Sequence, residues 1–268
     1  MLDTRHSICR EGHQVHMEKI IVDNGQNFDF GKTSTEYAKY RDIYPKELYD
    51  RLYAIGIGKE GSRWLDLGTG TGVIPRGLAE HGADIVATDI SAEQIEEAKK
   101  LSEGFYNITY KVSSAEEIDY PDNSFDVITA CQCFWYFEPS IIVPKIKQLL
   151  KQGGIFLKLY MSYLKDDPIA MQSHALVKEL NPNWIGGSAA VQDLRTHYFP
   201  EPQMENFIIE LPFTQADWHG RMMASRGVLA SMDEDTVKIF EDRHLSLLST
   251  QPEAFTIKHK VFLTYYYM

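Results

Sequence analysis

Cysteine is scarce in this chain: only Cys9, Cys131 and Cys133 occur among 268 residues. Three is an odd number and the spacing matches no disulfide framework, so we do not expect a disulfide-stapled secreted protein. The expectation is a reduced, cytoplasmic protein. Cys131 and Cys133 share one face if they lie on a strand. Because no second pair of metal-ligating side chains lies near them in the sequence, we interpret them as buried thiols and predict no metal site.

Long apolar runs are also missing. No stretch approaches the roughly 18–20 apolar residues that a membrane-spanning helix needs. The first 20 residues carry charges throughout and have no apolar centre, so we expect no secretory signal. The sequence therefore predicts no membrane partner.

Positive charge is in short supply. The chain has 27 Lys and Arg against 38 Asp and Glu, which gives a formal net charge of −11 and a pI of about 5.3. Such an average field repels polyanions, and no stripe of Lys and Arg offsets it. We therefore expect a small-molecule substrate and no nucleic acid, while the oligomeric state stays open.

The most informative segment that is present runs from Trp64 to Ala79, with the sequence WLDLGTGTGVIPRGLA. An apolar strand leads into Gly68, Gly70 and Gly72, and a helix-like run follows at once. Glycine can turn sharply and lets a ligand approach the backbone. A helix that starts there presents free N–H groups and the positive end of its dipole. This strand, turn and helix predict a nucleotide-type cofactor site.

The glycine spacing indicates which cofactor. A dinucleotide site has the pattern G-x-G-x-x-G, but Val73 stands where its third glycine would be. Asp66, two residues before the first glycine, suits a ligand that carries an ammonium group. The segment closely resembles the first motif, E/D-x-G-x-G-x-G, of the class I S-adenosylmethionine-dependent methyltransferases. The resemblance implies S-adenosyl-L-methionine as the cofactor.

The resemblance also implies roles for residues downstream. Asp89 lies 19 positions after Gly70, at the end of a predicted strand, where an acid accepts hydrogen bonds from the ribose hydroxyls. Taken alone, Asp89 could instead cap the next helix. The remaining cofactor positions that the resemblance implies are Thr69 in the glycine loop, Ile90 after the second strand, Ala115 and Glu116 beside the adenine, and Gln132 after the fourth strand.

Strand-like and helix-like segments alternate from residue 63 to residue 160, which predicts a parallel sheet covered by helices on both faces. The family resemblance implies an α/β, Rossmann-like, doubly wound sheet of seven strands, mostly parallel with an antiparallel seventh strand. The expected organisation is an N-terminal extension (1–34) and a methyltransferase domain (35–268), the latter containing lid helices (35–58) and a substrate insertion after the fifth strand (161–205).

The lid is predicted from Tyr37, Tyr40, Arg41 and Tyr44, which recur at helical spacing. Such a stripe can pack on the sheet or close over the cofactor. The pattern resembles small-molecule methyltransferases of the trans-aconitate and ubiquinone/menaquinone type. In that reading Tyr40 and Arg41 approach the methionine end of the cofactor.

The acceptor site is less well specified. Phe134, Trp135 and Tyr136 follow the fourth strand and either line an acceptor pocket or close the core. Relatives of the trans-aconitate type often have a histidine where this chain has Trp135, and indole cannot act as a base. Catalysis is then expected mainly from proximity and desolvation. Further pocket candidates are Trp184 and Trp218, the latter on a stripe that also suits a core, and candidates for a base are His174, His197 and His219.

Three functions therefore stay open at this point. The first is transfer of a methyl group to a small molecule by in-line displacement, at an O, N or C atom. The second is a nicotinamide-dependent oxidoreductase, against which Val73 and Asp66 argue. The third is a non-catalytic protein that binds S-adenosylmethionine.

Overall fold

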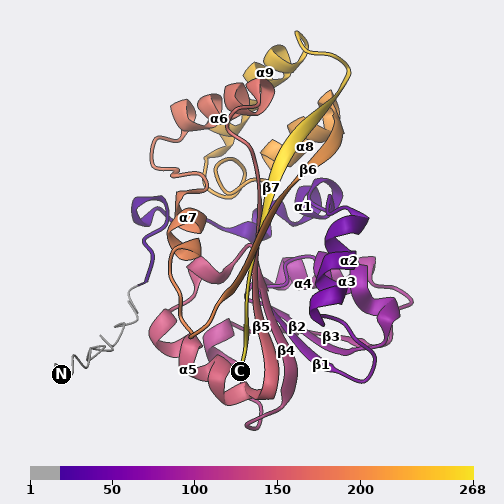
Figure 1. The fold of residues 1–268 in the computed structure, drawn as a ribbon. Coiled ribbons are helices and arrows are strands. Elements are labelled where there is room, and N and C mark those ends of the chain that lie inside the picture. Colours follow the sequence, from indigo (N-terminus) through magenta and orange to yellow (C-terminus); the bar gives the residue numbers. More distant parts are fainter. Residues whose placement is uncertain (1–18) are drawn as a thin grey trace, which may run out of the picture.

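The centre of the molecule is a seven-stranded sheet with the strand order β3-β2-β1-β4-β5-β7-β6 (Figure 1). The computed structural model describes residues 19–268. Strands β3 to β5 are parallel, whereas β7 runs antiparallel to both of its neighbours. The expected Rossmann-like sheet with an antiparallel seventh strand is confirmed. The strands are β1 Arg63–Leu67, β2 Asp84–Asp89, β3 Ile108–Val112, β4 Phe125–Cys131, β5 Leu150–Tyr163, β6 Gln203–Thr214 and β7 Ala254–Tyr267.

Helices begin and end where local capping chemistry allows. Ser91 starts α4 by accepting a hydrogen bond from the Gln94 amide, and Thr214 and Asp217 form a reciprocal capping box at the start of α8. The α-helices are α1 Ser34–Tyr40, α2 Lys46–Ile55, α3 Val73–Leu78, α4 Ala92–Leu101, α5 Pro139–Leu149, α6 Pro168–Leu180, α7 Ser188–Leu194, α8 Gln215–Met223 and α9 Glu234–Leu248. Short 3-10 turns occupy Asp23–Gly25, Phe30–Thr33, Ala79–His81, Ala115–Glu117 and Phe134–Tyr136.

Successive strand residues face opposite sides of the sheet, and each side has its own core. Trp64 of β1 faces the core built with α2, α3, α6, α8 and α9, whereas its neighbour Leu65 faces the core built with α5. Both side chains are fully buried. Burial of such a side chain is worth about 1.5–3 kcal/mol, so both cores stabilise β1.

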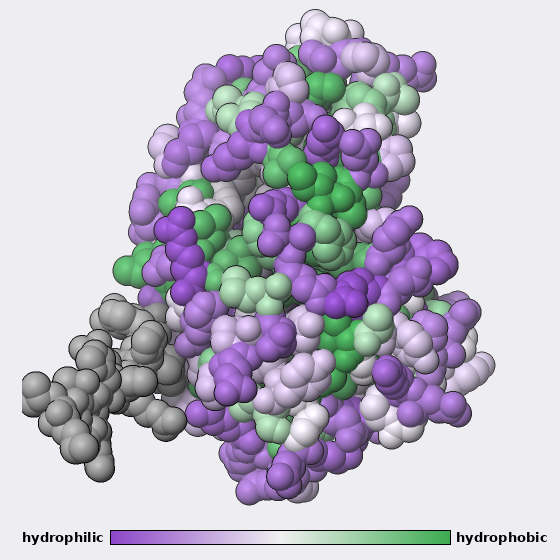
Figure 2. Space-filling view, viewed as in Figure 1, coloured by the Kyte–Doolittle hydropathy of each residue, from purple (hydrophilic) through white to green (hydrophobic). Residues whose placement is uncertain are grey.

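Strands β6 and β7 extend beyond the parallel part of the sheet to the layer of α6, α8 and α9 (Figure 1). Helix α1 packs on α8 in this layer: a Cβ at Gly220 of α8 would come within 2.3 Å of the Tyr40 ring. The surface is mostly hydrophilic, and apolar side chains gather in the band between these helices and the sheet (Figure 2).

The N-terminal segment is part of the folded unit from residue 19 onward. Residues 1–18 of the expected extension lie outside the described residues. Ile20 and Asp23 are buried, with 6% and 1% of their surface exposed. The part of the expected N-terminal extension (1–34) that begins at residue 19 is thus packed against the rest of the molecule.

No helix of the described residues is both long and apolar enough to cross a bilayer.

One buried histidine makes stability depend on pH. His244 of α9 is fully buried between the Ser173 hydroxyl and the ring of His219, each 2.9 Å away. Burial, and then His219, lower the pKa of His244 to about 3. The unfolded chain takes up this proton near pH 6.5, so stability is complete above that pH and is lost as pH falls toward 3.

We expect His244→Gln to flatten the stability profile between pH 6 and pH 5. The free energy of unfolding of the native chain should fall by about 1.4 kcal/mol per pH unit more than that of the variant. Urea unfolding at several pH values measures both slopes, and the difference in slope is informative even if the substitution lowers stability overall. Equal slopes would mean that His244 is not the buried neutral group described here.

Candidate functional site

The carboxyl ends of β1, β2 and β4 meet at the point where the strand order reverses, and a cavity of about 620 Å³ opens there. Open α/β sheets bind ligands at this place. Of the residues expected at the cofactor, Gly68, Gly70, Asp89, Ile90, Ala115, Glu116 and Gln132 line this cavity.

The three glycines of the loop all have left-handed backbone conformations, with φ of +61°, +58° and +74°. A Cβ at Gly68 would come within 2.8 Å of Cys133 Sγ, and one at Gly72 within 2.2 Å of the Tyr110 hydroxyl. A Cβ at Gly70 would stand at the cavity, with Gln94 Oε1 as its nearest neighbour at 3.7 Å. Gly68 and Gly72 thus permit packing, and Gly70 keeps the cavity wall free of a side chain. Contrary to expectation, Gly72 does not line the cavity.

Asp89 organises the loop as well as the cavity. Its Oδ2 accepts a hydrogen bond from the Gly70 amide at 2.8 Å, and its Oδ1 accepts one from the Ser91 amide at 2.9 Å. Burial raises the pKa of this carboxyl group, although these backbone donors act in the opposite direction. Each oxygen retains a second lone pair for a ligand hydroxyl. The tie from Asp89 to Gly70 was not foreseen from the sequence.

Asp66 is not part of the cavity lining, contrary to the expectation that it meets the ammonium group. It is 1% exposed, and its Oδ1 accepts a hydrogen bond from Thr129 on the neighbouring strand β4. Burial raises the pKa of Asp66 to about 6. Thr69 is likewise buried outside the lining. Thr129 also accepts a hydrogen bond from Trp64 Nε1 at 2.7 Å. Asp66 therefore takes part in a buried contact that links β1 to β4.

The far wall of the cavity comes from the turns after β3 and β4. Glu116 lines it, with Oε1 accepting a hydrogen bond from the Glu138 amide at 2.8 Å. Gln132 has a left-handed backbone (φ +64°), and its side-chain amide donates to the Met161 carbonyl at 2.7 Å. This contact ties the end of β4 to the end of β5. The side chain of Gln132 is thereby held at the edge of the cavity.

The N-terminal segment supplies part of the lining that sequence reasoning missed. Phe28, Asp29 and Phe30 line the cavity, together with Tyr37 of α1. Phe30 packs edge-to-face against Tyr37 and Tyr136, with ring centroids 6.4 Å and 6.0 Å away. The only signal in the sequence was the pair of phenylalanines in an otherwise polar stretch. Tyr40, expected at the cofactor, instead packs on Gly220 outside both cavities.

A second cavity of about 550 Å³ adjoins the first. The two share Phe30, Tyr37, Gln132 and Tyr136 as lining residues. Arg41, expected at the cofactor, lines this second cavity. So do Trp135, Tyr136, Trp184 and His174, which were expected at the acceptor or as a base, and so do the unforeseen Arg221 and Arg226 of the segment after β6.

Four expected acceptor-site residues lie elsewhere. Phe134 is 1% exposed and packs on Phe156 and Tyr198 in the core on the α5 side. Trp218 is fully buried and donates through Nε1 to Ser173. His197 is exposed and lines neither cavity, and His219 is hydrogen-bonded to His244 between α8 and α9. Tertiary packing, which residue type alone does not reveal, decides each case.

His174 is the remaining candidate for a base. Its Nδ1 lies 3.0 Å from the Tyr163 hydroxyl, and its ring packs on Trp184 with centroids 4.7 Å apart. Burial, followed by the charges of Lys165 and Lys178, lowers the pKa of His174. The imidazole is therefore neutral near pH 7 and can accept a proton. His174 lines the second cavity, although it does not belong to the wall shared with the first.

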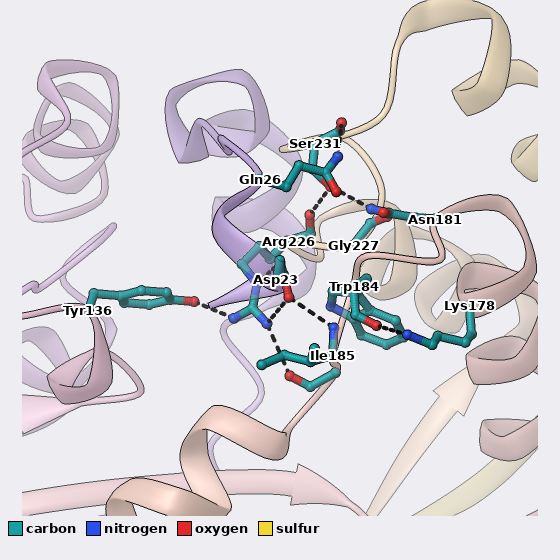
Figure 3. Close-up of polar contacts among 11 residues, drawn as sticks. Asp23, Gln26, Tyr136, Lys178, Asn181, Trp184, Ile185, Arg226, Gly227 and Ser231 are labelled. Atoms are coloured by element: carbon teal, nitrogen blue, oxygen red, sulfur yellow. Dashed lines mark hydrogen bonds and ion pairs between the residues drawn. The ribbon is translucent and has the colours of Figure 1, made fainter. Parts of the chain in front are cut away.

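The N-terminal segment is fastened to the wall of the second cavity by a buried ion pair (Figure 3). Arg226 donates to both carboxylate oxygens of Asp23, at 2.6 Å and 3.0 Å, to the Tyr136 hydroxyl at 2.7 Å and to the Gly186 carbonyl at 3.0 Å. Asp23 also accepts from the Ile185 amide at 2.9 Å. One guanidinium thus joins the N-terminal segment, the end of β4 and the insertion after β5.

Cys131 and Cys133 both line the first cavity, and burial raises the pKa of both thiols. Within residues 19–268, no group of three or more His, Cys, Asp or Glu side chains is arranged to hold a metal ion.

Comparison with known proteins agrees with this arrangement. Residues 65–157 match the model of a family described as a methyltransferase domain. Over this segment the chain is similar to methyltransferases. The segment contains the glycine loop, Asp89 and the end of β4, so the match covers the elements that form the first cavity. The resemblance to class I S-adenosylmethionine-dependent methyltransferases is thereby confirmed.

Individual relatives share this domain over part of their length. An uncharacterized methyltransferase of Mycobacterium tuberculosis is 31% identical over 128 residues, which are 48% of this chain and 50% of that protein. A ubiquinone biosynthesis O-methyltransferase of Xanthomonas euvesicatoria is 33% identical over 114 residues, or 41% of this chain and 46% of that protein. The chain therefore spans about half the length of the curated relatives it matches.

A solved structure shows the same fold over most of the chain. It is a protein of Anaeromyxobacter dehalogenans described as a type II methyltransferase, with a TM-score of 0.61 and 21% sequence identity. The likeness covers 84% of this chain and 97% of that protein. The methyltransferase domain and the segments around it thus share one known architecture.

Proposed function

We propose that this chain is an S-adenosylmethionine-dependent methyltransferase that acts on a small molecule. The observation that carries the proposal is the pair of adjoining cavities, which share Phe30, Tyr37, Gln132 and Tyr136 as a common wall. The methyltransferase domain lines the first cavity with its glycine loop and Asp89. The second has the volume of a small-molecule site and an aromatic lining.

The residues present fit the proposed cofactor. Gly70 leaves its side of the first cavity without a side chain, and Asp89 presents oxygens with free lone pairs to ribose hydroxyls. Tyr37 and Phe30 offer aromatic faces near the wall shared by the two cavities, and such faces attract a cation. The cofactor, when bound, supplies an electrophilic methyl group on a positively charged sulfur.

Positioning is the main contribution that the chain makes to the reaction. The Met161 carbonyl fixes the Gln132 side chain, and Arg226 fixes the Tyr136 hydroxyl, so both groups of the shared wall are held in place. Holding the acceptor in line with the methyl group removes a large entropic part of the barrier. The aromatic rings exclude water, and His174 can receive a proton where the acceptor must lose one.

The acceptor class is tested with radioactive methyl transfer. Purified protein and labelled S-adenosylmethionine are incubated in parallel with a small-metabolite extract, with tRNA and with DNA. We expect label in the metabolite fraction only. Saturable labelling of tRNA or DNA, without labelled metabolites, would contradict the small-molecule assignment.

S-adenosylhomocysteine, the demethylated product, is expected to stabilise the native protein. A ligand that binds only the folded state at about 100 times its Kd adds about 2.7 kcal/mol by mass action. Melting curves at rising ligand concentration measure the effect, with adenosine as the control because it lacks the amino-acid part. A melting temperature that stays constant up to millimolar ligand would contradict the cofactor assignment.

A further inference from the structure

Charge is divided sharply between the two cavities. The first is lined by Asp29, Asp89, Glu93 and Glu116, and its lining contains no Lys or Arg among the described residues. The second is lined by five cationic side chains, namely Arg41, Lys165, Arg221, Arg226 and Lys260. Its described lining contains no Asp or Glu. A chain with a net charge of −11 thus gathers positive charge around one cavity. Such a site concentrates anions.

Arg221 is the unusual member of this group. It is 4% exposed, and no described residue accepts a hydrogen bond from its side chain or forms an ion pair with it; Nε in particular is buried without a partner. Its guanidinium lies over the rings of Tyr163 and Trp218, 5.1 Å from each centroid. Burial, and then the charge of Arg41, lower the pKa of Arg221 to about 9. A buried charge without a counter-charge is costly to the fold.

Arg226 lines the same cavity and shows the opposite condition. It is 8% exposed, and its donors are used by Asp23, Tyr136 and Gly186 (Figure 3). Burial acts to lower the pKa of Arg226, but Tyr136 and Asp23 raise it above its usual value. The fold therefore provides a carboxylate for one buried arginine of this cavity and leaves the other without one.

A second buried donor lines the same cavity. Trp135 is 8% exposed and lines the cavity, yet its Nε1 has no hydrogen-bond partner among the described residues. Unpartnered buried donors are rare in native proteins. Arg221 and Trp135 together leave the second cavity with hydrogen-bond donors and a positive charge, and with apolar rings around them.

We propose that the methyl acceptor is a small organic acid whose carboxylate pairs with Arg221 and whose apolar body lies against Trp135 and Trp184. This inference rests on the proposed function and names the substrate class of its second cavity. A guanidinium matches a carboxylate with two parallel hydrogen bonds. The carboxylate also offsets the repulsion between the charges of Arg221 and Arg41. Binding therefore removes the free-energy cost of two neighbouring arginine charges that lack a counter-charge in the cavity.

The test measures charge selectivity in the protein loaded with S-adenosylhomocysteine. Calorimetric titrations use benzoate, cinnamate, indole-3-acetate and octanoate, each against its neutral amide, and phenyl phosphate as an alternative anion. We expect at least one acid to bind about tenfold or more tightly than its amide, the scale of a charge-assisted pair. Arg221→Met should reduce this ratio to about one, and Arg221→Lys should retain part of it. Arg195→Met, an equal change in charge at an exposed position outside both cavities, should leave the ratio unchanged.

Several results would overturn the proposal. These are an amide that binds as tightly as its acid, no acid binding at about 10 mM, phenyl phosphate preferred over every acid, or selectivity that survives in Arg221→Met. Titration with S-adenosylhomocysteine, done first, distinguishes failure of the proposed function from failure of this inference. Failure of S-adenosylhomocysteine to bind would contradict both the proposed function and this inference. Binding of S-adenosylhomocysteine, without preference for acids over their amides, would contradict only this inference.

Discussion

Replacing Asp89 with alanine is expected to weaken S-adenosylmethionine binding by about two orders of magnitude. Two charge-assisted hydrogen bonds to ribose hydroxyls, each worth about 1.5 kcal/mol or more, set this scale. The substitution also releases the amides of Gly70 and Ser91, which the carboxylate holds in the folded chain. Loop geometry and ligand contacts are thus lost together. Calorimetry on the purified variant measures the change.

Asp126→Ala is the matched control for this variant. Asp126 is the second residue of β4, near the opposite end of the sheet, and accepts hydrogen bonds from the Arg63 amide and from Lys151 Nζ, each at 2.8 Å. Its removal also frees a backbone amide but leaves the first cavity untouched. We expect cofactor affinity to stay at the native value in this control. Native affinity in Asp89→Ala as well would refute the assignment of Asp89.

Replacing Arg226 with methionine is expected to lower the free energy of unfolding by about 3–5 kcal/mol, the cost of removing one partner of a buried ion pair. The variant leaves the Asp23 carboxylate buried, with only the Ile185 amide as a donor among the contacts described above. Arg221→Met, in the same cavity, removes a buried charge that has no counter-charge among the described residues. The urea concentration at the unfolding midpoint of that variant should equal or exceed the midpoint of the native chain. Urea unfolding of both variants makes the comparison.

A double variant checks the cause. Asp23→Asn removes the charge that Arg226→Met leaves unpaired, so the two changes together should cost less than their sum. Additive losses, or an Arg221→Met variant as unstable as Arg226→Met, would show that packing and not charge pairing distinguishes the two arginines.

The parts of the fold that were predicted correctly depend on local patterns. The alternation of strand-like and helix-like segments from residue 63 to residue 160 predicted the parallel sheet, because alternation and capping act over a single turn or strand. Gly70 and Asp89 were both predicted at the cofactor, and both line the first cavity because the fold brings the ends of β1 and β2 together. Seven of the twelve residues expected at the cofactor line the first cavity.

The errors share a different cause, which is contact between segments distant in sequence. Asp66 was expected at the ligand, but its carboxylate accepts a hydrogen bond from Thr129 of the adjacent strand. Trp218 was considered for the pocket, but Ser173 of α6 and the surrounding core enclose it. Arg221, three residues after Trp218 on α8, lines the cavity instead. Periodicity identifies which residues share a face, and it does not identify what that face meets.

Equilibrium binding of S-adenosylmethionine and of NADH to the native chain tests the central claim most directly. The glycine loop, with Val73 in place of the last glycine of a dinucleotide site, and Asp89 at the end of β2 predict saturable binding of S-adenosylmethionine at one site per chain, with no measurable NADH binding. Calorimetry with each ligand in turn gives both answers from one preparation. Saturable binding of NADH, with none of S-adenosylmethionine, would contradict the account and support a nicotinamide-dependent oxidoreductase.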